Sequence, residues 1–243
     1  MSTFNDWARG IDLSKIIEWL MFAAAALVSI SVHESSHALS AYWLGDDTAK
    51  RSGRISLNPL RHLDPLGFLM MVVVHFGWAK PVPVNPARMT KVKSQKTGMA
   101  LTALAGPLSN LLLAFVFGCL YFICAYAGGM KLWMMLDGYT AGSGLHYWLT
   151  IFLERFLILN VGLAVFNLIP ISPLDGFKIL AIILPEASYS KLMRYERYGM
   201  LILIALLYLG WLDVPLQFLM KGVLNGIQAV AVPLAKLVTG VRG

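Results

Sequence analysis

Long apolar runs separated by short polar segments dominate this chain. Three runs are each long enough for a helix that crosses a bilayer, which needs about 20 residues. The third run ends in the sequence NLIPISPLDG, where two prolines and a glycine break the helical pattern. The three predicted spanning helices cover residues 16–44, 99–127 and 147–168.

The C-terminal quarter of the chain predicts two further helices. Residues 198–212 are apolar and predict a fourth span. Residues 214–238 are interrupted by Gln217 and Lys221, so this run predicts either a span or an amphipathic helix at the membrane surface. We therefore expect an all-α polytopic membrane protein with about five transmembrane helices.

The segment between the first two spans, residues 45–98, differs in composition. It is polar, basic and rich in turn residues, and its one apolar stretch, residues 66–78, is short for a span. That stretch predicts a re-entrant or interfacial segment. Pro81, Pro83 and Pro86 follow it and exclude a helix, which leaves an extended or edge-strand path. We expect a small re-entrant and β segment here.

Composition supports a membrane protein and argues against nucleic-acid binding. Hydrophobic residues make up 58% of the chain and charged residues 14%, whereas soluble domains are about a quarter charged. The net charge of +7 does not indicate a nucleic-acid site, because the sequence contains no basic helix with interleaved aromatic residues. Residues 1–243 show no internal repeat and no second soluble domain. They predict one membrane-embedded domain, with a core at about 16–184 and C-terminal helices at about 196–238.

Charge also predicts the orientation of the chain in the membrane. Residues 45–98 carry nine lysines and arginines, whereas the loop between the second and third spans carries only Lys131. Basic residues collect in cytoplasmic loops. We therefore expect residues 45–98 on the cytoplasmic side and the amino terminus on the opposite side.

The first span carries the sequence HESSH, which matches the pattern H-E-x-x-H. His33 and His37 lie four residues apart, so on a helix they share a face and can reach one metal ion. Glu34 lies beside them, in position to act on a water molecule. Zinc suits two neutral imidazoles. Two packed core histidines are the alternative, but ionisable groups inside a membrane segment are costly and usually functional.

A catalytic zinc ion usually has a third protein ligand. His62 and His75 lie in the polar or re-entrant segment, and His146 is expected on the far side of the membrane. Asp175 is the better candidate, because its helix break is expected at the same membrane face as the two histidines. The alternative role for Asp175 is that of a turn or N-cap residue.

Five segments in this order resemble the site-2 protease family of intramembrane zinc metalloproteases, peptidase family M50. The match is closest to compact prokaryotic members without PDZ or CBS domains, and it covers about residues 31–184. The segments are VHESSHALSAYWLGD, LNPLRHLDPLG, FGWAKPVPVNP, AGPLSN and FNLIPISPLDG.

The resemblance implies a role for each matching residue. His33, His37 and Asp175 would bind one zinc ion per chain, and Glu34 would be the general base. Asn110 and Asn167 match asparagines of the active-site region, where either side chain could donate to the scissile carbonyl or to the developing oxyanion. The edge of the extended segment would bind an unwound substrate as an added strand. The residues expected there are Trp78, Pro81, Val82, Pro83 and Val84.

The function expected from these observations is zinc-dependent hydrolysis of a peptide bond in or near a transmembrane segment of another protein. The expected location is the plasma membrane of a prokaryote, with several spans and with the active site toward the cytoplasm. A regulatory partner is possible in such a system but has no signature in the sequence. A metal transporter or zinc sensor, and an inactive scaffold of the same fold, are the alternatives. A transporter often has repeated halves, which are absent here, and an inactive scaffold would normally have lost a ligand or the glutamate.

Overall fold

The structure is a computed structural model, and it describes residues 13–67, 80–127, 145–185, 188, 194 and 196–241. Within these residues the chain is helical and forms no sheet. The predicted all-α polytopic fold is confirmed. The predicted β segment forms no ladder in the described part of the chain, and most of the predicted re-entrant stretch, from residue 68 on, lies outside it.

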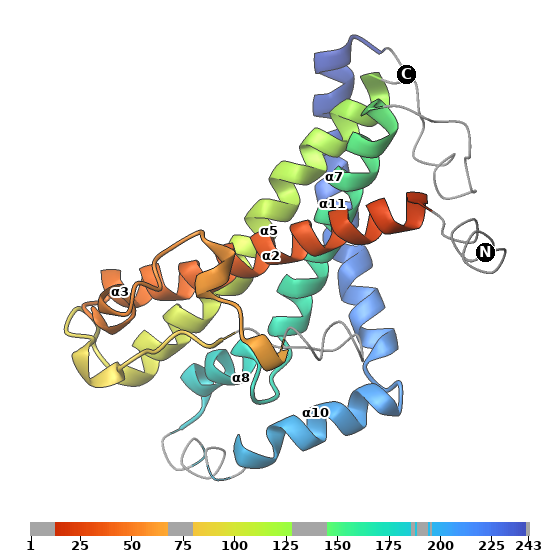
Figure 1. Cartoon of the computed structure of the whole chain (residues 1–243). Coiled ribbons are helices and arrows are strands. Elements are labelled where there is room, and N and C mark those ends of the chain that lie inside the picture. Colours follow the sequence, from red (N-terminus) through yellow and green to blue (C-terminus); the bar gives the residue numbers. More distant parts are fainter. Residues whose placement is uncertain are drawn as a thin grey trace, which may run out of the picture.

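Four of the described helices are long and apolar enough to cross a membrane. Three of them confirm the first three predicted runs within four residues at each end. The fourth lies at the C-terminal end of the chain and runs alongside the second and third, whereas the first lies across them (Figure 1). These helices are α2 (Leu13–Trp43), α5 (Gln95–Ala127), α7 (Leu145–Asn167) and α11 (Asp213–Thr239).

The prediction of a span at residues 198–212 is wrong. Only α10 (Gly199–Tyr208) forms there, and ten residues of helix extend about 15 Å, half the thickness of the hydrocarbon core. Gly210, with φ of 70°, is in the left-handed conformation that ends helices, which explains the early stop. Of the two alternatives for residues 214–238, the structure favours the span, because the run forms the long helix α11, which is apolar enough to cross a membrane despite Gln217 and Lys221.

Helices α5, α7 and α11 enclose the main apolar core, and α2 packs against α5 and α7. Phe117 of α5 stacks on Phe156 of α7, with ring centroids 3.8 Å apart. Gly118 lets α11 approach closely, because a Cβ there would lie 2.7 Å from Ile227. Small residues at contacts of this kind are typical of membrane helices, where close packing drives association.

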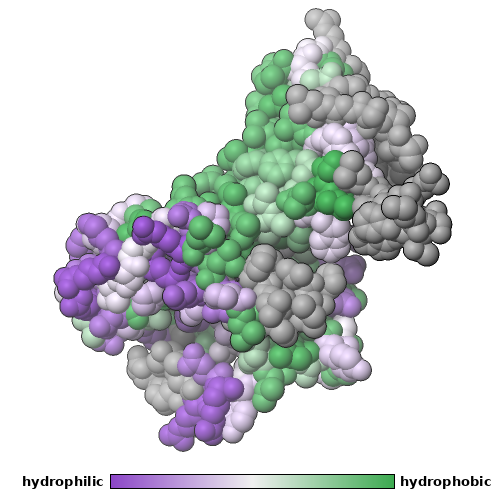
Figure 2. Space-filling model, viewed as in Figure 1, coloured by the Kyte–Doolittle hydropathy of each residue, from purple (hydrophilic) through white to green (hydrophobic). Residues whose placement is uncertain are grey.

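The polar segment after α2 folds as short helical pieces: α3 (Thr48–Arg51), η1 (Pro59–Arg61) and η2 (Pro86–Arg88). α2 ends in a Schellman motif, in which Gly45 N–H donates to Tyr42 O and Asp46 N–H donates to Ala41 O. Hydrophilic residues gather over the α3 end of the molecule, whereas the long helices present an apolar surface (Figure 2). The polarity of this face therefore matches a bundle in lipid with one wet end.

The chain after α7 makes a compact turn and enters α8 (Asp175–Leu180), followed by η3 (Ala181–Ile183). After η4 (Glu196–Tyr198), α10 lies across the lower end of the bundle (Figure 1). A Cβ at Gly199 would lie 2.3 Å from Ser172 O, so the start of α10 packs directly on the turn before α8. α10 therefore helps to enclose the region around Asp175.

Candidate metal centre

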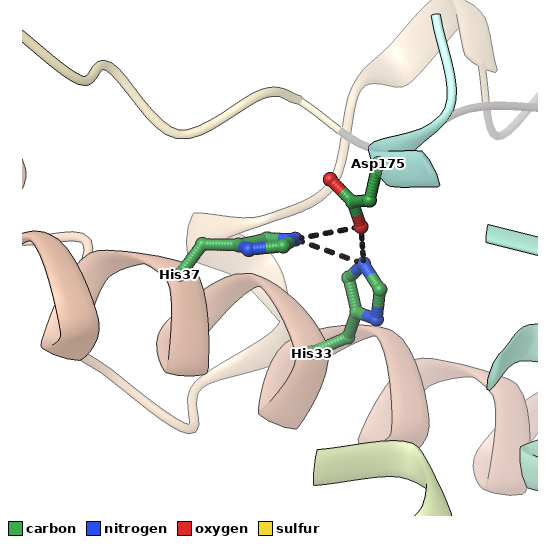
Figure 3. Close-up of side chains that lie close together, drawn as sticks. All are labelled: His33, His37 and Asp175. Atoms are coloured by element: carbon green, nitrogen blue, oxygen red, sulfur yellow. Dashed lines mark hydrogen bonds and ion pairs between the residues drawn. The ribbon is translucent and has the colours of Figure 1, made fainter. Parts of the chain in front are cut away.

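His33, His37 and Asp175 come together, although 138 residues separate the last two in the sequence. His33 Nε2 and His37 Nε2 are 3.0 Å apart, and each is 3.2 Å from Asp175 Oδ2 (Figure 3). The histidines lie one turn apart on α2, and the aspartate is the first residue of α8. All three residues are at least 92% buried. The sequence-predicted set therefore forms one compact cluster.

The orientation of His37 is fixed by the backbone of α5. His37 Nδ1 is 2.7 Å from Thr102 O. A backbone carbonyl can only accept, so Nδ1 must carry a proton, and in the neutral ring Nε2 then keeps its lone pair. That lone pair points toward Asp175.

Gly106 provides the space for both imidazoles. A Cβ at this position would lie 2.5 Å from His37 Nε2 and 2.6 Å from His33 Cε1. The two rings therefore rest directly on the α5 backbone, and only glycine allows this approach. The next residue, Pro107, has no N–H for the carbonyl of residue 103, so the helix has lost one of its own hydrogen bonds at this point.

The orientation of His33 depends on Asn110, whose Oδ1 is 2.5 Å from His33 Nδ1. Asn110 Nδ2 donates to Asn160 Oδ1 at 2.8 Å. Asn110 is fully buried and does not line the cavity described below. Its side chain therefore lies behind the His33 ring, and not toward the cavity where a scissile carbonyl would lie.

The three ligand atoms fit a single cation. When both Nδ1 atoms are protonated, each Nε2 presents a lone pair, and Asp175 Oδ2 is buried without a hydrogen-bond donor. Three acceptors at 3.0–3.2 Å have no proton to share. Two atoms bound to one tetrahedral zinc at about 2.1 Å lie about 3.4 Å apart. A zinc ion therefore fits both the donor types and their spacing.

A cavity of about 490 Å³ opens beside this cluster, and Glu34 lines it together with the three ligand residues. Glu34 lies on the same side of α2 as the histidines, about 60° around the helix from His37. α10 contributes Met200 and Leu203 to the wall, and α8 contributes Lys178. The site thus combines a metal-binding trio, a carboxylate and space for a peptide.

Two further polar residues of the sequence analysis line the same cavity. Asn167 is half-buried, and its Nδ2 donates to Leu163 O at 2.9 Å within its own helix. His62 is buried outside the metal cluster, with Nε2 2.6 Å from Ser56 O. His75 lies outside the described residues, as does the side chain of His146.

Residues 80–85 form another part of the cavity wall. Pro81, Val82 and Val84 line the cavity, and Trp78 lies outside the described residues. Burial alternates along this segment, with both valines half-buried and both prolines exposed. A period of two is typical of extended backbone, as the sequence predicts.

Two buried charged side chains hold this segment in place. Arg54 donates to Lys80 O at 2.9 Å and to Pro81 O at 2.7 Å. At the other end, Asp46 Oδ2 accepts from Asn85 N–H at 2.6 Å. Burial raises the pKa of Asp46, but the hydrogen bonds from Thr48 and Asn85 outweigh it and hold that pKa below its ordinary value.

The residues that support the site were not predicted from the sequence. Thr102, Gly106, Asn160 and Ser29 lie on three different helices, and their roles depend on contacts across the bundle. One signal was available in the sequence. A glycine followed by proline inside an apolar helix, as at Gly106, often has a packing or functional reason.

Comparisons with known proteins agree with this geometry. Residues 21–210 match the family model described as peptidase family M50. The chain is 41% identical over 180 residues to "Putative zinc metalloprotease YwhC" of Bacillus subtilis (strain 168), covering 74% of this chain and 76% of that protein. It is 29% identical over 205 residues to "Putative zinc metalloprotease Rip2" of Mycolicibacterium smegmatis, covering 80% and 69%. No solved structure gives a significant match.

Proposed function

The chain belongs to peptidase family M50. We propose that it hydrolyses peptide bonds in transmembrane segments of other proteins, and that the reaction takes place in the cavity beside His33, His37 and Asp175. The chain is a zinc-dependent metalloendopeptidase embedded in a bilayer. The observation that carries the proposed site is the buried cluster in which two imidazole Nε2 atoms, acceptors when the rings are neutral, face the unpartnered Asp175 Oδ2 in the wall of the cavity that Glu34 also lines.

We assign the zinc ligands to His33 Nε2, His37 Nε2 and Asp175 Oδ2. Zinc, when bound, polarises a carbonyl and lowers the pKa of a water molecule, which is the chemistry that peptide hydrolysis needs. Glu34 takes the proton of the attacking water and passes it to the leaving nitrogen. Asn110 keeps His33 in its binding orientation. Asn167 remains the candidate donor to the substrate carbonyl, because it lines the cavity.

The extended segment is the proposed binding site for the opened substrate strand. In such a strand the N–H and C=O groups of alternate residues share an edge. Val82 and Val84 therefore present two N–H groups on one edge, and neither N–H has a partner in the described part of the chain. Pro81 and Pro83 have no N–H to offer on the other edge. A substrate would pair with the valine edge, beside the cavity that these valines line. Trp78 stays a sequence-based prediction.

The chain is a membrane protein of a bacterium, and its substrates are membrane proteins. We propose that the membrane is the plasma membrane and that the site opens toward the cytoplasm. The support is the excess of lysine and arginine in residues 45–98, which include the segment lining the cavity. We also propose that the whole chain acts as one protease domain, because α10 and α11 pack on the same bundle.

A metal transporter using the same ligands is not favoured. Such a site must open alternately to both faces, usually through two repeated halves. The sequence contains no repeat, and Glu34 beside a complete set of three ligands has no use in transport. An inactive scaffold is disfavoured because every candidate ligand and the glutamate are present.

Cleavage assays in detergent or liposomes test the proposal. Wild-type protein and the Glu34→Gln variant are incubated with a set of synthetic transmembrane peptides, and zinc content is measured in both. We expect about one zinc per chain in each protein, and cleavage by the wild type alone. The proposal fails if the zinc-loaded wild type cuts no more than the variant does.

The orientation has its own test. Ser94 is exposed in the basic segment, and Ser94→Cys provides a single site for a membrane-impermeant thiol reagent once Cys119 and Cys124 are replaced by serine. We expect labelling in inverted vesicles and none in intact cells. Labelling in intact cells would reverse the assigned side.

A further inference from the structure

A chain of buried hydrogen bonds leads away from His33 and crosses three helices. His33 and Ser29 lie on α2, Asn110 on α5 and Asn160 on α7. Asn110 links His33 to Asn160, and Asn160 Nδ2 lies 2.8 Å from both Ser29 Oγ and Phe156 O. Asn110, Asn160 and Ser29 are all 0% exposed. The side-chain amides of both asparagines are therefore hydrogen-bonded. This matters because an amide without partners is costly in a membrane core.

The direction of this chain is set at its far end. Phe156 O is a backbone carbonyl and can only accept, so the Asn160 atom facing it must be the donor, Nδ2. The other atom of that amide, Oδ1, can only accept, so Asn110 must present Nδ2 to it. This leaves Asn110 Oδ1 facing His33, and His33 Nδ1 must carry the proton.

Ser29 strengthens the same direction without setting it. Its hydroxyl donates to Ala25 O at 2.7 Å and accepts from Asn160. Without Ser29, Phe156 O would still hold Asn160 in the same orientation. In this series of hydrogen bonds, Asn160 sets the donor–acceptor direction, and Ser29 only adds one hydrogen bond.

From this geometry we infer that Asn160 is a positioning residue, which acts through Asn110 to fix the tautomer of His33 with its Nε2 lone pair toward the metal site. His37 reaches the same state through a direct contact with Thr102 O. The inference rests on the proposed role of His33 as a ligand. The chemical reason is that a neutral histidine can bind a cation through the Nε2 lone pair only when its proton is on Nδ1.

Removal of the amide at position 160 releases this constraint. In Asn160→Leu, Asn110 loses its acceptor and its amide can rotate by 180°. Nδ2 then faces His33 Nδ1, which becomes an acceptor, and the proton moves to Nε2, where it blocks the metal. In Asn160→Asp, a protonated carboxyl group can still accept from Asn110 and donate to Phe156 O. The aspartate variant should therefore rescue what the leucine variant loses.

Zinc affinity, measured by competition with a chelator in detergent, tests the inference without any turnover. We expect Asn160→Leu to weaken zinc binding by about 10–100-fold, the usual loss for a partner behind a metal ligand. Asn160→Asp should lie closer to wild type. Ser29→Ala should lose less than about threefold. Thr150→Val, which changes another buried polar residue of α7, should leave the affinity unchanged.

The tautomer itself is visible in ¹⁵N spectra of histidine-labelled, metal-free protein, and His33 can be identified among five histidines by single replacement. We expect protonation at Nδ1 in wild type and at Nε2, or at both in exchange, in Asn160→Leu. Wild-type zinc affinity together with an unchanged His33 tautomer in that variant overturns the inference. Equal losses in Asn160→Leu, Asn160→Asp and Ser29→Ala also overturn it, because they would show general damage to the core. A wild type that binds zinc but cleaves nothing would refute the protease and leave this inference intact.

Discussion

A methyl group at Gly106 should disable the metal centre while leaving the helix that carries it sound. The added Cβ would lie 2.5–2.6 Å from the imidazole rings of His33 and His37. Carbon atoms in contact prefer at least about 3.5 Å, so the rings or α5 must move by about 1 Å. Zinc bond lengths tolerate only about 0.2 Å. The Gly106→Ala change therefore pushes the ligands out of range of one ion.

The expected loss of zinc affinity is at least about 100-fold, the upper end of what indirect support of a ligand is worth. That loss corresponds to about 2.7 kcal/mol. Alanine is the better helix former by about 1 kcal/mol, so the helix itself should not unfold. Overpacking against the two rings costs about 1–3 kcal/mol, and the gain in helix propensity offsets part of that cost, so the loss should appear mainly in metal binding.

Chelator competition and thermal unfolding with and without zinc measure the two quantities separately. Gly222→Ala and Gly226→Ala in α11 are matched controls, because nothing lies within 4 Å of a Cβ at either position. The controls should bind zinc as the wild type does. Native zinc affinity in Gly106→Ala would refute this prediction, because it would mean that the two rings do not rest on the α5 backbone.

Three further predictions follow from the site and its supports. Asp175→Asn should weaken zinc binding by at least about tenfold, because an amide oxygen carries no charge. If the variant binds zinc as tightly as the wild type does, Asp175 is not a zinc ligand. Asp46→Asn should lower stability by about 1–3 kcal/mol at pH 7. The pKa of Asp46 is lower in the folded than in the unfolded protein, so its contribution to the free energy of unfolding is present above the unfolded pKa of about 3.9 and is lost as the pH falls below it. The stabilities of the two proteins, measured by unfolding, should therefore converge in acid. A constant difference across pH would contradict this. An Ala→Gly change near the scissile bond of a substrate helix should speed cleavage about fivefold, since glycine costs a helix about 1 kcal/mol; rates that do not rise would mean that the substrate is not opened as a strand.

The sequence predicted the parts of this protein that depend on local pattern. Long apolar runs predicted α2, α5 and α7, because length and hydropathy decide whether a helix can cross a bilayer. The spacing of His33 and His37 on one helix predicted their shared face. The break before Asp175 predicted its return to the same end of the bundle. Family membership and the zinc-dependent activity are confirmed.

The failures came from features that local pattern does not contain. Residues 198–212 have the composition of a span, but Gly210 adopts a left-handed conformation and ends the helix early. For residues 214–238 the sequence left both a span and a surface helix open, because Gln217 and Lys221 interrupt the run. Its apolar face, which packs on α5 and α7, became apparent only in the structure. Asn160 could not be identified, because one amide in an apolar run has no meaning until α5 and α2 are placed beside it.

The prolines of residues 80–85 have a consequence for how this protein behaves among copies of itself. An open strand edge is a template for self-association, and sheets grow because each added strand exposes a new edge. Here Pro81 and Pro83 remove the donors from the edge opposite the valines, and Arg54 already occupies Pro81 O. A strand that joins the valine edge therefore cannot be matched by a second strand on the far side. Because none of the described residues pairs with the valine edge, that edge can stay open in a crowded membrane without aggregation starting from the opposite one.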